Sequence, residues 1–126
     1  MMAIRGVRGA IQVDEDTPEA ITSATRELLA AIMGSNPGLR PSDLASAFFT
    51  LTTDLSATYP ALATRDLPGW EYVPLLCSHE LPVPAGMPRC LRVLLHWNTK
   101  LDQKEINHVY LGETTKLRPD LALPHS

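Results

Sequence analysis

The sequence predicts an α+β fold in which a mixed β-sheet is accompanied by few, short helices. Three observations support this prediction. The 126 residues have room for one domain with one core. Predicted strands and helices are interspersed along the chain, and hairpin-like spacing recurs between the strands. We therefore treat residues 1–126 as a single domain.

The first elements are a strand and a helix. Residues 2–13 are predicted to form a strand that enters a turn. The run Asp16-Thr17-Pro18-Glu19 is typical of a helix start, because Asp16 or Thr17 can cap and proline suits the first helical position. Asn36-Pro37-Gly38 ends this helix. Its predicted buried positions recur at helical spacing at Ile21, Thr25, Leu28, Leu29 and Ile32.

The middle of the chain reads mainly as strands separated by turns. Residues 41–44 form one helical turn, and residues 54–67 are helical in part, with Pro60 opening a turn. The loop over residues 82–88 is rich in proline and glycine. The predicted strands here are residues 45–53, 72–77 and 89–99.

We expect a last short helix over residues 103–111 and a short extended piece with a tail over residues 113–126. Prolines at 119 and 124 disfavour a helix there, and we expect residues 116–126 to be a mobile tail. About five strands with two or three short helices cannot cover both faces of a sheet. The uncovered apolar surface predicts an oligomer.

Composition argues against several classes of protein. A net charge of −3 without a basic stripe argues against nucleic-acid binding. The chain lacks an apolar run of membrane-spanning length, and Met1 to Arg8 does not resemble a signal peptide, so we expect a soluble, cytoplasmic protein. Cys77 and Cys90 fit neither a redox pair nor a zinc knuckle, and the histidines form no close pair, so we expect no metal.

The basic residues are unevenly divided, with eight arginines and three lysines. Arginine grips carboxylates with two parallel hydrogen bonds, so this excess in an acidic protein favours a small anionic ligand. A simple composition bias would give the same count.

Two predicted strands carry an arginine among apolar or small neighbours. Alternation from 89 to 97 puts Arg92 on the face of Leu94, opposite the face of Val93. Arg8 is the sole charge on its face of the first strand, and Gly6 and Gly9 leave room for a close approach. A solvated sheet face and ordinary turn glycines are the plain alternatives.

Further candidates lie at Cys77-Ser78-His79-Glu80 and near the C-terminus. Glu80 could act as an acid, a base or a charge stabiliser. Strict alternation separates Cys77 from Glu80 unless the strand ends or bulges there. A Cys77–His79 nucleophile is disfavoured because adjacent strand residues point apart and a third orienting group is not evident. Tyr110 and Arg118 add donors for an anion, or are simply a packed aromatic and a surface charge.

Taken together, these residues resemble the AroH class of chorismate mutases over nearly the whole chain. Each string is weak alone, but their order and spacing make the match specific. The strings are Ile4-Arg5-Gly6-Val7-Arg8-Gly9-Ala10, Tyr59-Pro60-Ala61 with Arg65, Gly69-Trp70-Glu71-Tyr72-Val73-Pro74, Cys77 with Glu80, Cys90-Leu91-Arg92-Val93, His108-Val109-Tyr110-Leu111 and Leu117-Arg118-Pro119-Asp120-Leu121.

The resemblance implies a homotrimeric pseudo-α/β-barrel that rearranges chorismate to prephenate without a cofactor, at sites shared between subunits. It implies that Arg8 and Tyr110 hold substrate carboxylate, that Arg92 points at the ether oxygen, and that Glu80 and the neighbourhood of Cys77 face the ring hydroxyl. It also implies a pocket lined by Tyr59, Ala61, Val73 and Leu117, with Arg65 and Arg118 at its mouth.

One departure and two alternatives remain. The family pattern usually has a lysine where this chain has Leu62, so one entrance charge is missing. A pericyclic rearrangement needs no nucleophile or proton transfer, which agrees with the lack of a triad motif. The alternatives are a trimeric imine deaminase of the Rid type and a non-catalytic trimer that senses an aromatic-pathway acid.

Overall fold

The computed structural model describes residues 1–121, and within them the chain forms one mixed five-stranded sheet. The strand order is β3-β2-β4-β1-β5. β4 pairs antiparallel with both β1 and β2, while β3 and β5 are parallel to β2 and β1 at the two edges. The predicted α+β class with a mixed sheet is confirmed. The strands are β1 (Ala3–Gln12), β2 (Leu44–Leu51), β3 (Leu75–His79), β4 (Cys90–Thr99) and β5 (Val109–Tyr110).

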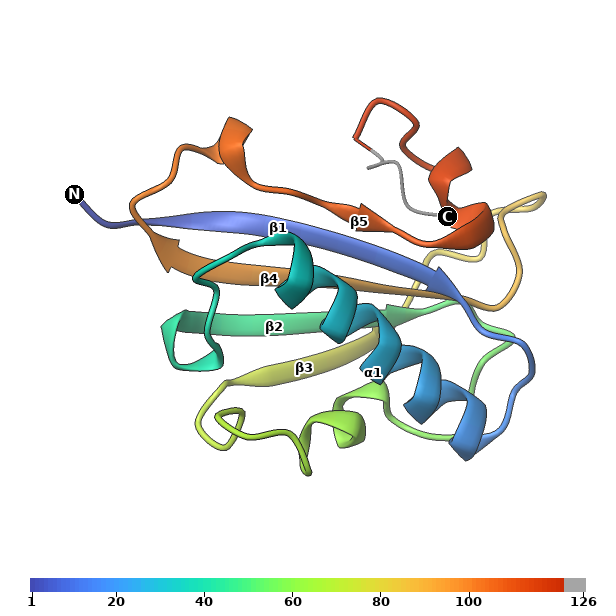
Figure 1. Cartoon of the computed structure of the whole chain (residues 1–126). Helices are drawn as coiled ribbons and strands as arrows, with labels where there is room; N and C mark the ends of the chain where they lie inside the picture. The colour runs from blue at the N-terminus through green and yellow to red at the C-terminus, as the bar shows by residue number, and fades with distance from the viewer. Residues whose placement is uncertain (122–126) are drawn as a thin grey trace.

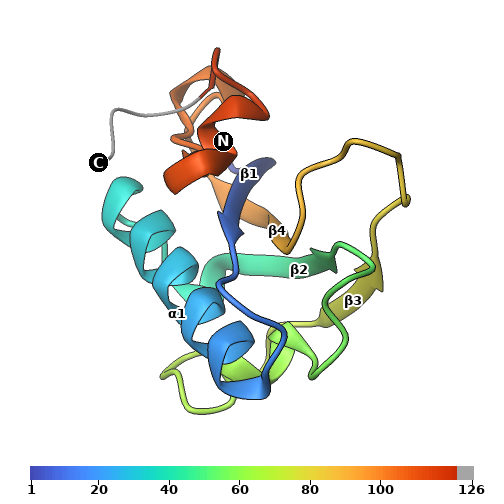
Figure 2. The ribbon, with the colours of Figure 1, turned by 90° about the vertical axis from the view of Figure 1, so that its right-hand side faces the viewer.

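One long helix, α1 (Pro18–Ser35), crosses one face of the sheet (Figures 1 and 2). It begins as the sequence predicts: the Thr17 side chain accepts a hydrogen bond from the Ala20 N–H at 3.1 Å, and Pro18 needs no partner. Asn36 closes the other end, where its side-chain amide donates to the Ile32 carbonyl. All five positions of this helix that were predicted to be buried are buried.

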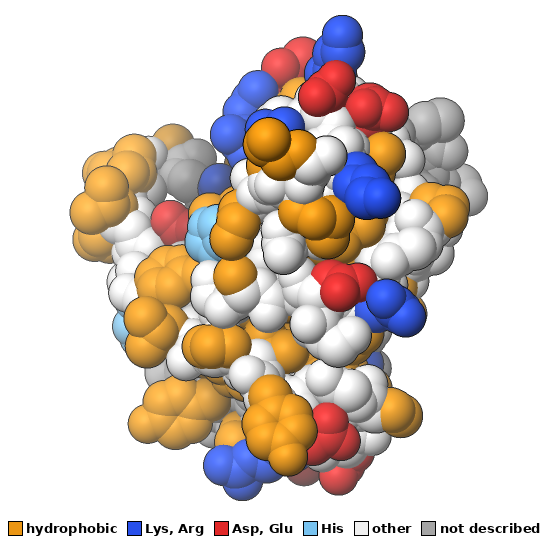
Figure 3. All heavy atoms as spheres, turned by 90° about the vertical axis from the view of Figure 1, so that its left-hand side faces the viewer, with side chains coloured by type: hydrophobic (Ala, Val, Ile, Leu, Met, Phe, Trp, Pro, Cys, Tyr) orange, Lys and Arg blue, Asp and Glu red, His pale blue; other side chains and the backbone are white. Residues whose placement is uncertain are grey.

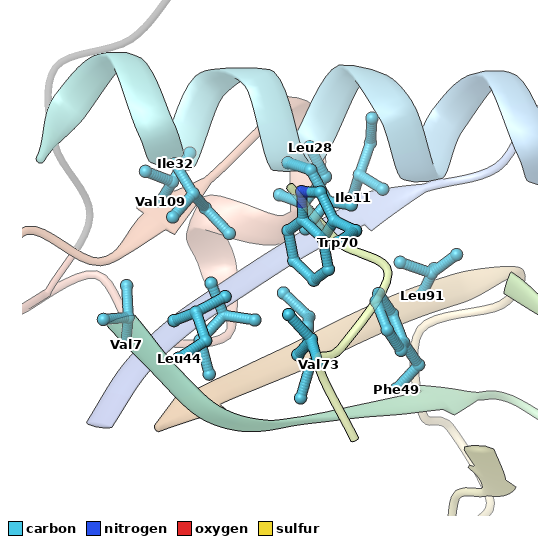
Figure 4. Packing of buried hydrophobic residues seen from close by; sticks show 14 of the residues in the cluster. Val7, Ile11, Leu28, Ile32, Leu44, Phe49, Trp70, Val73, Leu91 and Val109 are labelled. Atoms are coloured by element: carbon cyan, nitrogen blue, oxygen red, sulfur yellow. The ribbon is translucent and has the colours of Figure 1, made fainter. Parts of the chain in front are cut away.

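The core lies between α1 and the sheet (Figure 4). Leu28 and Ile32 of α1 point toward the sheet, and they belong to one buried cluster with Phe49 of β2 and with Trp70. Gly9 of β1 makes this close packing possible, because a Cβ at that position would lie 2.6 Å from Ile32 Cδ1. The close approach at Gly9 is therefore made by the protein's own helix.

The C-terminal third differs from the prediction. A helix over residues 103–111 is wrong: a short 3-10 helix (Gln103–Glu105) is followed by β5, because Leu111 donates to the Ala10 carbonyl and residues 109–110 pair with β1. Long-range pairing outweighs local helical preference here. The expected extended piece over residues 113–126 begins instead within a 3-10 helix (Gly112–Lys116). Residues 122–126 of the predicted tail lie outside the described residues.

The remaining differences are small shifts. The predicted strand over 72–77 is β3, which starts later because Val73 closes a turn on the Trp70 carbonyl and Pro74 has no N–H to donate. The two expected helical turns before it are the 3-10 helices Pro41–Asp43 and Pro60–Thr64.

The second face of the sheet carries no helix among residues 1–121, as Figure 2 shows. Its exposed apolar side chains include Ile4 of β1, Leu76 of β3 and Leu94 of β4. The described residues also contain no helix of the length and apolarity that a membrane crossing requires.

Candidate active site

A cavity of about 400 Å³ opens on the second face of the sheet, lined by residues of β1, β2, β4 and β5 and of the segments that follow β3 and β5. This volume is in the range of small-molecule sites. Its polar lining comes from segments far apart in the chain. The polar residues that line it are Arg8, Thr50, Glu80, Arg92, Tyr110 and Arg118.

Arg92 lies on β4 as the alternation predicts. The neighbours Leu91 and Val93 are buried in the core, whereas the Arg92 side chain is 44% exposed and borders the cavity. Arg92 Nε stands 3.8 Å from Glu80 Oε1, which is an ion-pair distance but too long for a hydrogen bond. The guanidinium therefore keeps its donors available to a ligand.

Glu80 follows β3 directly and continues its alternation, so it lies on the same face as Leu76 and Ser78 and reaches the cavity. Its backbone N–H donates to the Leu51 carbonyl at 2.8 Å, and its carboxylate accepts a hydrogen bond from the Thr50 hydroxyl. Glu80 thus sits on the open face, while Cys77 packs against the core on the other.

Arg8, Tyr110 and Arg118 form the opposite wall. Tyr110 is 4% exposed, and Leu117 lies beside it at the cavity lining. Arg118 donates two hydrogen bonds to the Asp120 carboxylate, which raises the pKa of Arg118 and lowers that of Asp120. Three guanidinium groups against Glu80 give the cavity an excess of positive charge. Such a site suits an anion with carboxylates.

His108 supports this wall from behind. The Arg8 backbone N–H donates to His108 Nδ1 at 3.0 Å, so the ring must leave that nitrogen unprotonated. Burial, followed by the positive charges of Arg8 and Arg118, holds the pKa of His108 below its ordinary value of 6.5. The histidine is thus a neutral acceptor that completes the pairing of β1 next to Arg8.

We predict that His108 makes the fold sensitive to acid. Between pH 6.5 and the lowered pKa of the folded ring, the unfolded chain binds a proton at His108 more fully than the folded chain does. Its contribution to the free energy of unfolding is therefore complete above pH 6.5 and falls as the pH drops toward the lowered pKa. Between about pH 7.5 and 5.5 the loss of Tm should be smaller in His108→Asn, whose Oδ1 can replace Nδ1 as acceptor. An equal loss in both proteins would contradict this assignment.

A second cavity, of about 500 Å³, lies beyond the β3 edge. Tyr59, Leu62 and Cys77 line it, together with His79. His79 Nε2 donates to the Leu55 carbonyl at 3.0 Å, and burial raises the pKa of the Cys77 thiol. The Cys77 thiol therefore stays protonated, and the His79 Nε2–H is already used in a hydrogen bond to a carbonyl. Cys77 is not an activated nucleophile.

The structure therefore divides the sequence-predicted site residues into two groups. Arg8, Glu80, Arg92, Tyr110, Leu117 and Arg118 line the first cavity, whereas Tyr59 and Cys77 line the second. Ala61 is half-buried near Cys77, and Arg65 is exposed at the end of the same 3-10 helix. Val73 is a core residue and belongs to the same buried cluster as Leu44 and Phe49 (Figure 4). Within one chain, the predicted pocket is not assembled.

Sequence reasoning missed Thr50 and His108. Thr50 shares its face of β2 with Phe48, and both line the first cavity. Period-2 alternation alone could not show which face that was, since it depends on the pairing of Thr50 with Arg92. Among the described residues, no three metal-ligating side chains lie close enough to hold an ion.

Comparison with known proteins gives consistent matches. The family described as chorismate mutase type I matches residues 4–121. A chorismate mutase AroH from Thermus thermophilus is 51% identical over 118 residues, covering 94% of this chain and 96% of the relative. The corresponding protein from Bacillus subtilis is 43% identical over 122 residues, covering 97% and 95%. A solved chorismate mutase structure from Clostridium thermocellum superposes with a TM-score of 0.84 at 40% identity, covering 88% of this chain and 97% of that one.

Proposed function

The chain belongs to the chorismate mutase type I family and is a chorismate mutase, an isomerase of aromatic amino acid biosynthesis, and we propose that it works by conformer restriction and electrostatic stabilisation. This identification decides against the imine deaminase and the non-catalytic sensor. The observation that carries the mechanism is the cavity in which three arginines face one carboxylate. Purified protein should convert chorismate to prephenate without added metal or cofactor, and loss of chorismate absorbance measures it.

The reaction breaks an ether bond and forms a carbon–carbon bond within one molecule. The enolpyruvyl arm must lie over the ring, and negative charge grows on the ether oxygen while the ring becomes positive. In our proposal Arg8 and Tyr110 hold a substrate carboxylate, Arg92 stabilises the ether oxygen, and Glu80 faces the ring hydroxyl. The excess of guanidinium groups and the separation of Glu80 from Arg92 support this assignment. Both charges then act on the transition state.

We further propose that each complete site forms between two subunits of a homotrimer. The first cavity is open to solvent in the single chain, and the second lies at a different edge with its own predicted site residues, Tyr59 and Cys77. Tyr59 is 69% exposed and Leu76 of the open sheet face is 68% exposed. Figure 3 shows groups of hydrophobic side chains on the molecular surface. Packing of subunits through the exposed side chains of Leu76 and Tyr59 would bring one subunit's Tyr59 toward another's Arg92.

A mixed-subunit experiment tests the shared site. Arg92→Ala removes one half of the site, and Arg65→Glu places a repelling charge on the other. Each homotrimer should be nearly inactive. Co-expression at equal levels should restore about one quarter of wild-type activity, because about one quarter of the interfaces combine two intact halves. No recovery in assemblies shown by sedimentation to contain both variants would contradict shared sites.

A cytoplasmic location remains a prediction, which cell fractionation would test.

A further inference from the structure

We propose that Thr50 is a positioning residue that fixes the Glu80 carboxylate and keeps its charge apart from that of Arg92. This inference rests on the role of Glu80 in the proposed function. It is suggested by a hydroxyl that lines the cavity and donates to the same carboxylate oxygen that lies closest to Arg92.

Thr50 occupies the centre of a row that crosses the sheet. On β2 it is the register partner of Ser78 on β3 and of Arg92 on β4. Glu80, just past the end of β3, is held by two consecutive residues of β2: the Leu51 carbonyl accepts its N–H, and Thr50 donates to Oε1. Backbone and side chain of Glu80 are thereby both fixed to β2, which is hydrogen-bonded on both sides within the sheet.

The position of that hydrogen bond determines what Arg92 can do. Glu80 Oε1 is 3.8 Å from Arg92 Nε, so the two charges are close but not hydrogen-bonded. An ionised carboxylate can only accept hydrogen bonds. The Thr50 hydroxyl donates one to Glu80 Oε1, and in our proposal Oε2 accepts from the ligand. Both side chains are partly exposed, at 31% for Glu80 and 44% for Arg92, so neither is held by burial alone.

Without the hydroxyl, the carboxylate is free to turn onto the guanidinium. Carboxylate and guanidinium groups favour a close pair with two parallel hydrogen bonds. In such a pair each charge would neutralise the other, and both would have to separate before they could act on a substrate. Thr50 therefore prepares the site, although it does not itself need to touch the reacting atoms.

Thr50→Val tests the proposal, because valine keeps the shape and strand preference of threonine while removing the donor. We expect kcat to fall on the order of tenfold to hundredfold, which is the range for a lost hydrogen bond to a charged group, with KM changed less. Thr50→Ser should restore kcat to within about threefold of wild type. A serine variant as impaired as the valine variant would show that the methyl group matters, and would overturn the proposal.

Two controls separate positioning from stability. Thr25→Val removes a buried hydroxyl that donates to Ile21 on α1, on the other side of the core, and should lower Tm without lowering kcat. Should Thr50→Val fail to fold, Thr50→Ala provides the same loss of the donor. Thr50 variants that retain wild-type kcat while Glu80→Ala is impaired would overturn this inference and leave the proposed function standing.

A double-mutant cycle gives the decisive measurement. If Thr50 acts through Glu80, then adding Thr50→Val to Glu80→Ala should lower kcat by no more than about twofold further. The same fold loss in both backgrounds would mean that Thr50 acts independently of Glu80, and would overturn the proposal. Wild-type kcat in Glu80→Ala alone would instead refute the role that the proposed function gives to Glu80.

Discussion

Replacing Arg92 by citrulline is expected to lower kcat on the order of 10³-fold or more while the fold and assembly persist. Citrulline keeps the planar shape and most hydrogen bonds of arginine but has no charge. Negative charge grows on the ether oxygen only as the bond breaks, so a cation there binds the transition state better than the substrate. Loss of one neutral oxyanion donor already costs roughly 10²–10³ in rate, and a charged group should be worth at least as much.

Two further substitutions at Arg92 help to interpret the citrulline variant. Arg92→Ala should be impaired at least as severely, and Arg92→Lys should remain badly impaired because it keeps the charge but loses the planar fork. Arg92 is half-exposed on β4, so none of these changes should unfold the protein. Steady-state kinetics and sedimentation measure the two properties separately. Near-normal kcat in the citrulline variant would mean that positioning alone explains catalysis.

Glu80 gives the second large expected effect. Glu80→Ala should lower kcat strongly, by on the order of 10² or more, because the developing positive charge on the ring loses its counter-charge. Glu80→Gln should be milder, since its amide oxygen can still accept from Thr50 or from the ring hydroxyl. Neither should change Tm greatly, because the carboxylate borders a cavity rather than the core.

The comparison between the two Glu80 variants separates charge from hydrogen bonding. Equal losses in kcat would show that the charge alone matters. No loss in either variant would remove Glu80 from the site. Kinetics at saturating chorismate, together with thermal unfolding of each variant, provide the measurement.

The sequence by itself determined the elements whose signals are local. The cap at Thr17 and the apolar spacing of α1 depend on neighbours within one or two helical turns, and both are found as predicted. Alternation in β4 likewise placed Arg92 opposite the buried Leu91 and Val93. Cys90-Leu91-Arg92-Val93 is also one of the strings that carry the family resemblance, and those strings made the activity predictable from the sequence.

Tertiary structure alone decided how those elements combine. β5 exists because β1 supplies distant hydrogen-bond partners, which no local pattern over residues 103–111 reveals. The row that joins Thr50 to Arg92 depends on strand register, and a slip of one residue would turn Thr50 to the other face. The separation of Tyr59 and Cys77 from Arg92 is likewise a matter of which sheet edge each segment follows. Local sequence determined α1 and which residues of β4 share a face, whereas long-range pairing determined which side chains of different strands meet.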